Sequence, residues 1–303
     1  MPNWITNKVK INANESQIKD ILTAIQRDGD VYGSFDFNKL ISMPASLDVT
    51  SGSITDEAID AFISYLSNEV SQHPDRPGSF EDIKRYVESA CQIKTNQLFS
   101  SQPDKFSPSE IDDLAERHDM STERFLALGK QYLDNQISHG HPTWYEWSIK
   151  NWGTKWNLDK GSVFDGEDTL SFDTAWSNPA PIMATLSSKF PSVEFFHKWA
   201  DEDLGYNVGT CTYLNGEIID SDIPLGGSAR AYEMAFEITG IDPAERCMRY
   251  DVKAGTYVYD ESMEEPVTPF HLSIDNLIDL AQAKTALNAG HEKEDPSHKD
   301  PVR

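Results

Sequence analysis

The side chains that could do chemistry lie in short acidic clusters and in one histidine pair. Asp201-Glu202-Asp203 and Asp220-Ser221-Asp222 could hold Mg²⁺ if folding brought them together, because Mg²⁺ takes carboxylate oxygens as ligands. His139-Gly140-His141 is the nearest approach to a transition-metal pair, but a glycine separates the two imidazoles and a proline follows them. The chain has 50 acidic residues, so such clusters arise by chance. Both patterns are therefore more typical of solvated loops than of metal sites.

Phosphate-binding and nucleophilic motifs are also incomplete. Gly226-Gly227-Ser228 precedes an expected helix whose first amides could bind a phosphate, but it lacks the P-loop lysine and the dinucleotide glycine spacing. Three isolated cysteines have no zinc spacing and fit a reducing cytoplasm. The sequence contains no Gly-x-Ser-x-Gly and no His-Glu-x-x-His motif. We therefore predict a protein that is not an enzyme, with no catalytic residue, no metal and no cofactor.

The net charge of −24 restricts the partners of the protein. Its 303 residues carry 26 basic and 50 acidic side chains. Such a surface repels phosphate backbones, so direct nucleic-acid binding is disfavoured. The acidic surface serves either solubility or competition for the basic surface of a nucleic-acid-binding protein. No apolar run approaches the length of a membrane span, so no membrane partner is expected.

Residues 143–157 hold four of the seven tryptophans in the chain. Thr143 followed by Glu146 predicts a capped helix that starts at Trp144, and Gly153 is placed to end it in a left-handed cap. A strand is expected to start at Thr154. Large aromatic rings dominate the energetics of cores and interfaces. We therefore expect most of these rings in a core between two halves of the protein, and one or two of them exposed as anchors for a partner.

Helical spacing divides these rings into two groups. Tyr145, Ile149 and Trp152 recur on one stripe, which we expect to be buried. Trp144 and Trp147 lie off that stripe and are the better candidates for exposure. The candidate residues for partner binding are Trp144, Trp147, Trp156, Asp201, Glu202 and Asp203, and the candidate core residues are Tyr145, Ile149, Trp152 and Trp176.

Hydrophobic periodicity predicts an α+β fold in three parts. Residues 1–140 are expected to form an N-terminal α+β domain that opens with strand, helix and strand, the second strand over 31–43, and continues as a helical middle. In that middle, one helix is expected to start after Ser79, and Ser107 with Glu110 is expected to form the capping box of another. Residues 141–240 follow the order strand, helix, strand, strand, strand, helix, which resembles a ferredoxin-like antiparallel module. Residues 241–303 are expected to form a C-terminal extension with a helix over 274–287 and a polar tail.

Several motifs resemble one known family. The opening Met1-Pro-Asn-Trp-Ile-Thr-Asn-Lys8, the central Asn151-Trp-Gly-Thr-Lys-Trp-Asn157 and Phe172-Asp-Thr-Ala-Trp176 look like the YubB/Api92-like proteins of phages and plasmids, and Tyr206-Asn-Val-Gly209 fits the same pattern. The resemblance implies a ferredoxin-like domain in the second half and a mobile-element origin, hence a location in the host cytoplasm. It brings no catalytic residues. In length and character the chain is also similar to a phage inhibitor of the Gabija defence system.

These observations favour a phage-encoded, non-enzymatic inhibitor that binds a bacterial defence nuclease complex, with Gabija as the first candidate, and blocks its DNA binding or cleavage. Homo-oligomerisation is expected, because repetition of one chain is the simplest way to surround a large target. Three alternatives stay open: an acidic DNA mimic against another nuclease or restriction system, a nucleotide-processing enzyme that uses carboxylate-bound Mg²⁺, and a single-stranded RNA binder that uses the ferredoxin-like sheet.

Overall fold

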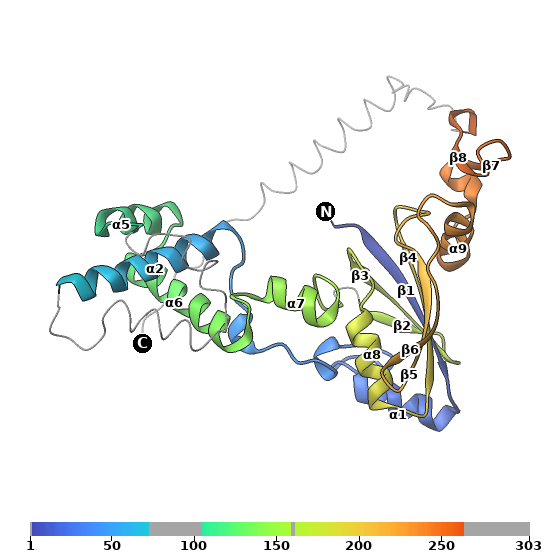
Figure 1. The fold of residues 1–303 in the computed structure, drawn as a ribbon. Coiled ribbons are helices and arrows are strands. Elements are labelled where there is room, and N and C mark those ends of the chain that lie inside the picture. Colours follow the sequence, from blue (N-terminus) through green and yellow to red (C-terminus); the bar gives the residue numbers. More distant parts are fainter. Residues whose placement is uncertain (1, 73–104, 159–160, 264–303) are drawn as a thin grey trace, which may run out of the picture.

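The computed structural model describes residues 2–72, 105–158 and 161–263, which form two units joined by one short helix (Figure 1). The sheet unit contains strands β1 to β6 with helices α1, α8 and α9, the helical unit contains α2, α5 and α6, and α7 lies between the two. The elements are β1 (Trp4–Asn12), α1 (Glu15–Ile25), α2 (Ser53–Gln72), α5 (Pro108–Arg117), α6 (Thr122–His139), α7 (Trp144–Trp152), β2 (Ser162–Phe164), β3 (Thr169–Ala175), α8 (Ala180–Lys189), β4 (Glu194–Asp201), β5 (Gly209–Leu214), β6 (Glu217–Asp222), α9 (Ala229–Thr239), β7 (Met248–Asp251) and β8 (Thr256–Tyr259). The mixture of helices with antiparallel sheet confirms the predicted α+β class.

The six strands of the sheet unit lie in the order β2-β3-β1-β4-β5-β6, and every neighbouring pair is antiparallel. β1 is a central strand: Trp4 lies opposite Ala175 of β3, and Ile5 lies opposite Asp201 of β4. The division predicted at residue 140 therefore does not describe this sheet, because its middle strand comes from the N-terminus. Partners so far apart in sequence leave no signal in local periodicity.

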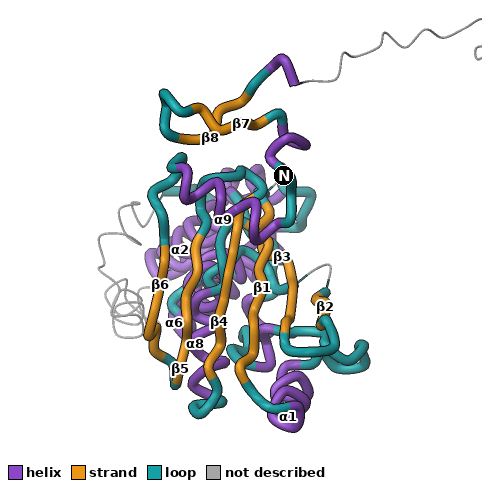
Figure 2. The backbone as a smooth tube through the Cα atoms, turned by 90° about the vertical axis from the view of Figure 1, so that its right-hand side faces the viewer, coloured by secondary structure: helices purple, strands orange, loops and turns teal. Residues whose placement is uncertain are grey.

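The two faces of the sheet differ, as the view in Figure 2 shows. One face is covered by α1 and α8 and holds the largest apolar core, which includes Val9, Phe172, Phe195 and Tyr213. The other face is covered at one end by α9, whose Met234 and neighbours form a separate core. The β7-β8 hairpin follows α9 and packs against it. Side chains that alternate between faces along each strand produce this arrangement.

A polar network is fully buried in the first of these cores. The Asn7 amide donates to the Ile5 carbonyl and to Thr174 Oγ1, each at 2.9 Å, and Asn7 Oδ1 lies 3.0 Å from His197 Nε2. Asn7 and His197 are both 0% exposed. Burial lowers the pKa of His197 to about 3, so this imidazole is neutral at pH 7 and donates its Nε2 proton to Asn7.

The helical unit has a core of its own. Ala58, Ile63, Phe125 and Tyr132 are buried together between α2, α5 and α6. At Gly129 the backbones of α6 and α2 come so close that a Cβ would lie 2.0 Å from the Ala58 carbonyl oxygen. Glycine at this position therefore sets the distance between the two helices.

Several local predictions are confirmed and others are wrong. Ser107 and Glu110 form the predicted capping box at the start of α5. The extended pattern over 31–43 is wrong, because its centre is a 3₁₀ turn, Phe37–Lys39, capped by the Asp36 carboxylate, which accepts from the Asn38 amide at 2.9 Å. The helices predicted after Ser79 and over 274–287 lie outside the described residues. Among the residues that are described, none of the helices combines the length and apolar character needed to cross a membrane.

Candidate functional site: an aromatic surface around Lys155

The turn after α7 brings Lys155 against the end of the sheet. Gly153 ends α7 with a φ of 79°, as predicted, and a Cβ there would lie 2.6 Å from Pro181 Cδ at the start of α8. Thr154 Oγ1 then donates to the Ala175 carbonyl at 2.7 Å, which fixes the turn to β3. The strand predicted to start at Thr154 is absent from this segment, which bends instead.

The Lys155 ammonium lies over three aromatic rings. Its Nζ is 4.3 Å from the ring centroid of Trp156, 4.5 Å from that of Trp176 and 5.7 Å from that of Tyr145. It takes part in none of the ion pairs found among the described residues. Each contact of this kind contributes about 0.5–1 kcal/mol at an exposed position. We call Lys155 with Tyr145, Trp156 and Trp176 the aromatic surface.

Trp176 is the strained member of the aromatic surface. Its φ is 73°, in the left-handed region that a bulky side chain rarely adopts, and its side chain is 38% exposed. The backbone is held there by two bonds: the Trp176 amide donates to the Asn3 carbonyl at 2.8 Å, and the Trp176 carbonyl accepts from Asn207 Nδ2 at 3.1 Å. Backbone strain of this kind costs about 1–3 kcal/mol and persists where the surroundings enforce it.

An acidic and aromatic rim lies beside Trp176. Asp201 is 6% exposed, and its two carboxylate oxygens accept from Asn3 Nδ2 at 3.3 Å, from the Asp203 amide at 2.9 Å and from Asn207 Nδ2 at 3.1 Å. These bonds make Asp201 a structural residue. Glu202 and Asp203 are exposed, as is Tyr206.

The predicted assignment of exposed and buried rings is partly wrong. Trp147, expected at the surface, is 7% exposed and packs edge to face on Trp152 with ring centroids 5.4 Å apart. Ile149, expected in the core, is 40% exposed, and Trp176 is also at the surface. The α7 stripe turns toward the sheet unit through Trp147, Ser148 and Trp152, because α7 packs on α8 and not on the helical unit alone. Trp152 is buried as expected, and Trp144, Tyr145 and Trp156 are half-buried.

Lys155 and Tyr206 belong to the site but are absent from the predicted residues. The available signal for Lys155 was its place between a glycine helix stop and a tryptophan, which is where a chain reverses at the surface. The tryptophans around Lys155 form the dominant pattern of this segment, and a single lysine among them forms no pattern of its own.

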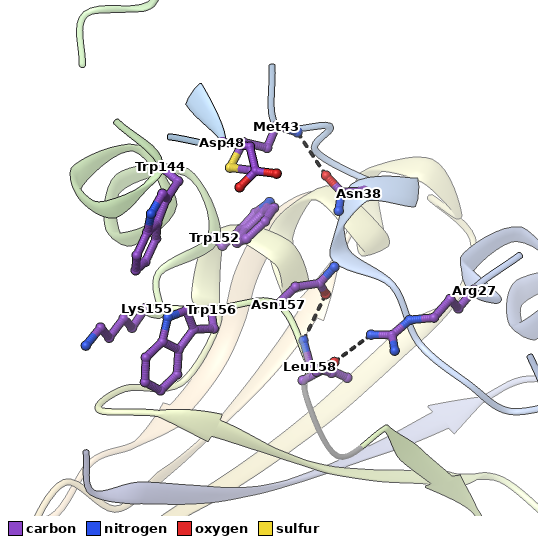
Figure 3. A pocket seen from close by; sticks show the side chains of 10 residues that line it. All are labelled: Arg27, Asn38, Met43, Asp48, Trp144, Trp152, Lys155, Trp156, Asn157 and Leu158. Atoms are coloured by element: carbon purple, nitrogen blue, oxygen red, sulfur yellow. Dashed lines mark hydrogen bonds between the residues drawn. The ribbon is translucent and has the colours of Figure 1, made fainter. Parts of the chain in front are cut away.

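Two cavities flank the aromatic surface. The larger, of about 630 Å³, lies between α7 and the segment from Asn38 to Asp48, and Figure 3 shows Trp144, Trp152 and Trp156 around it. The smaller, of about 400 Å³, lies between α7 and the start of α2. Trp144 and Lys155 line both, so they form the wall between the two.

The other predicted clusters are separate from the aromatic surface. His139 Nε2 lies 3.2 Å from Ser46 Oγ, whereas the pKa of His141 is lowered, mainly by burial and then by Lys150. Asp222 pairs with Arg230 at 2.9 Å, and Ser228 caps α9. In the described part of the chain, no three His, Cys, Asp or Glu side chains converge as a metal site would require.

Comparison with known proteins identifies the family of residues 151–242. Residues 151–242 match the family model described as the ferredoxin-like domain in Api92-like protein. The crystal structure of a protein api92 from Yersinia pseudotuberculosis is similar, with 12% sequence identity and a TM-score of 0.34 over 75% of this chain and 99% of that chain. No curated protein sequence matches the chain. The family match agrees with the motifs at Asn151–Asn157 and Phe172–Trp176, and residues 151–242 are therefore a ferredoxin-like domain of the Api92-like family.

Proposed function

We propose that this protein is a phage-encoded, non-enzymatic inhibitor that acts in the host cytoplasm. Its target is a bacterial antiviral defence complex, with the Gabija complex as the first candidate, and binding blocks DNA binding or cleavage by that complex. The observation that carries this proposal is Trp176, a large ring that is half exposed although its backbone is strained.

The chemistry of the aromatic surface fits a protein partner with a basic surface. Tryptophan and tyrosine are enriched among the residues that dominate binding energy in protein interfaces. Trp176 is exposed, and the loop whose Asn207 bonds to it carries the exposed Glu202, Asp203 and Tyr206. An arginine or lysine of the partner could therefore meet both a ring face and a carboxylate. DNA-binding surfaces are rich in such cations, and the net charge of −24 would speed the encounter with them.

Co-elution with the target tests the proposal. Purified protein is mixed with purified Gabija complex, separated on a sizing column and assayed for nuclease activity. We expect one larger particle and loss of DNA cleavage. Separate elution together with full nuclease activity at excess protein would exclude Gabija as the target.

A matched pair of variants tests the assigned surface. Trp176→Asn removes the ring but suits the left-handed backbone, because asparagine tolerates positive φ. Ile149→Ala removes a comparably exposed apolar group from α7. We expect the first variant to lose inhibition of the nuclease and the second to keep it. Equal inhibition by both variants would show that the aromatic surface is not part of the interface.

An acidic DNA mimic against another nuclease or restriction system is the second candidate. The exposed strand β6 supports it, since Glu217, Asp220 and Asp222 recur along this edge of the sheet. A mimic acts through exposed charge, which salt screens over about 10 Å at 0.1 M. Binding that falls steeply between low and moderate salt would favour the mimic, and binding that falls little would favour the aromatic surface.

The third candidate, a metal-dependent enzyme acting on nucleotides, would need Asp201 as a metal ligand. Both oxygens of this carboxylate already accept hydrogen bonds that position the loop after β4. A double replacement, Asp201→Ala with Asp203→Ala, that leaves any nucleotide turnover unchanged would exclude this site.

Homo-oligomerisation is part of the same proposal. β6 is an edge strand, and Ile218 and Ile219 on it are each 53% exposed. An unpaired edge that carries apolar side chains is a surface on which another chain can pair. Light scattering should give a mass above one chain of 34.1 kDa; a monomer at all concentrations would contradict this expectation.

A further inference from the structure

The larger cavity beside α7 has the size and composition of a small-molecule site. Its volume of about 630 Å³ lies within the range of roughly 300–1,000 Å³ that is typical of ligand pockets. Trp152 is buried and forms its floor, and the half-buried rings of Trp144 and Trp156 form two sides (Figure 3). Such indole walls suit a flat ring, because stacking of a base on an aromatic side chain contributes about 1–3 kcal/mol.

The polar groups of the cavity point to an anion at one end. Arg27 Nη2 donates to the Leu158 carbonyl at 2.5 Å, which holds the guanidinium at the cavity while its other N–H groups stay available. Lys155 also lines the cavity, but its ammonium lies over the rings of the aromatic surface, so Arg27 is the cation at this end. A guanidinium binds phosphate oxygens in a bidentate manner.

The other end of the cavity carries an acceptor. Asp48 is exposed at the mouth, near Trp144 and Trp152, and its carboxylate makes none of the hydrogen bonds or ion pairs found among the described residues (Figure 3). A carboxylate accepts two hydrogen bonds side by side. Guanine presents two neighbouring N–H donors on its pairing edge, whereas adenine presents a donor beside an acceptor.

We propose that this cavity binds a guanine nucleotide. The base lies against the indole of Trp144 above the buried Trp152, its edge donates to Asp48, and the phosphate lies toward Arg27. This site goes beyond the proposed inhibitory function and does not depend on it, because Asp48, Trp144 and Arg27 lie outside the aromatic surface, while Trp156 and Lys155 stand between the two sites.

The same chemistry could come from a free nucleotide or from the end of a single strand, and the charge of the protein favours the free nucleotide. A strand would add phosphates that the acidic surface repels. Titrations of GMP, AMP, guanosine and a 5′-phosphorylated oligonucleotide, followed by tryptophan fluorescence and calorimetry, separate the cases. We expect saturable binding of GMP at one site per chain, and binding about tenfold weaker for AMP and for guanosine.

Single substitutions test the role of each group in the cavity. Asp48→Asn should remove the preference for GMP over AMP, and Arg27→Met should reduce GMP binding to the level of guanosine. Arg27 also bonds to the Leu158 carbonyl, so its loss could disturb the local structure. Trp144→Ala, at a half-buried ring, is therefore a second variant and should weaken the binding of GMP and of AMP alike. Arg230→Met, which removes an exposed arginine of α9 that pairs with Asp222, is the matched control and should bind GMP normally.

Trp176→Asn should also bind GMP normally, which separates this site from the inhibitory surface. The proposal is overturned if GMP fails to bind at about 1 mM, or if binding is unchanged in both Arg27→Met and Trp144→Ala. Equal affinity for GMP and AMP would overturn the proposal that Asp48 recognises guanine. Tighter binding of the oligonucleotide than of GMP would overturn the choice of a free nucleotide as the ligand.

Discussion

The helical unit and the sheet unit of this protein differ in the contacts that stabilise each of them internally. The helical unit packs three helices around a small apolar core, with glycine at the closest approach of α2 and α6. The sheet unit builds a larger core around a central strand whose partners come from the far end of the sequence, and it buries a polar network at Asn7 and His197. The aromatic surface takes Tyr145 from α7, Lys155 and Trp156 from the turn after it and Trp176 from the residue after β3, so it lies where α7 meets the sheet unit.

The sheet unit tolerates backbone strain at the aromatic surface. The left-handed backbone of Trp176 directly follows a strand of the larger sheet. Its amide donates to the Asn3 carbonyl and its carbonyl accepts from Asn207, and these two bonds hold it. A rigid sheet can carry such strain, because the cost is small beside the free energy of the surrounding core. The helical unit also has a left-handed residue after a helix end, but it is Asp119, a small polar residue that tolerates this backbone without a sheet to hold it.

The largest expected effect is the loss of Trp147 from the sheet unit. Trp147→Ala removes a buried ring that packs on Trp152 and should lower the free energy of unfolding by about 3–5 kcal/mol. Ile149→Ala, two residues away and exposed, should change it by about 0.5 kcal/mol at most. Urea titrations of both variants measure the difference. Similar losses for the two would mean that α7 is turned the other way.

The helical unit should be most sensitive at Gly129. Gly129→Ala places a Cβ against the Ala58 carbonyl, so α6 must move away from α2, and we expect a loss of about 1–3 kcal/mol, confined to the helical unit. Gly140→Ala at the end of the same helix meets nothing within 4 Å and tests the backbone cost alone. Hydrogen exchange should show faster opening of α2 and α6 with unchanged β1. Equal loosening of both units would show that they unfold as one.

Acid should weaken the sheet unit first. The pKa of His197 is lowered to about 3 in the fold, below the ordinary value of 6.5, so the unfolded chain binds the proton more readily. The contribution of this group to stability is therefore full above pH 6.5 and falls as the pH drops toward 3, by about 1.4 kcal/mol per pH unit. Denaturation curves at pH 7 and pH 5 measure the slope. His197→Gln should reduce it, and an unchanged slope in that variant would assign the acid sensitivity to other groups.

The smallest expected effect is at the start of α5. Ser107 and Glu110 form a reciprocal capping box, so Ser107→Ala should cost the helical unit about 1 kcal/mol. Ser109→Ala, two residues further on, is a control that keeps both bonds between Ser107 and Glu110. Thermal unfolding followed by circular dichroism would measure the loss, and two identical melting temperatures would mean that this cap does not limit the stability of the unit.

Local signals predicted the helical elements better than the sheet. Ser107 with Glu110 and Gly153 marked helix ends correctly, because capping depends on residues close in sequence. The place of β1 in the sheet could not be predicted, because the residues opposite Trp4 and Ile5 lie in the second half of the chain.

The candidate site was predictable in outline only. The density of tryptophans marked the region, but which rings are exposed depends on the direction in which α7 faces, and helical spacing alone does not set that direction. For this reason the prediction placed Trp147 at the surface and Ile149 in the core, whereas the structure has the reverse. The strain at Trp176 comes from hydrogen bonds to Asn3 and Asn207, which no local pattern reveals.

The affinity of the Gabija complex for the Trp176→Asn variant tests the central claim most directly. If the aromatic surface is the centre of the interface, calorimetry should show binding weaker than that of the unaltered protein by at least about 2 kcal/mol, or about 30-fold, while Ile149→Ala binds normally. Equal affinities for the unaltered protein and both variants, or no affinity in any of them, would contradict the claim.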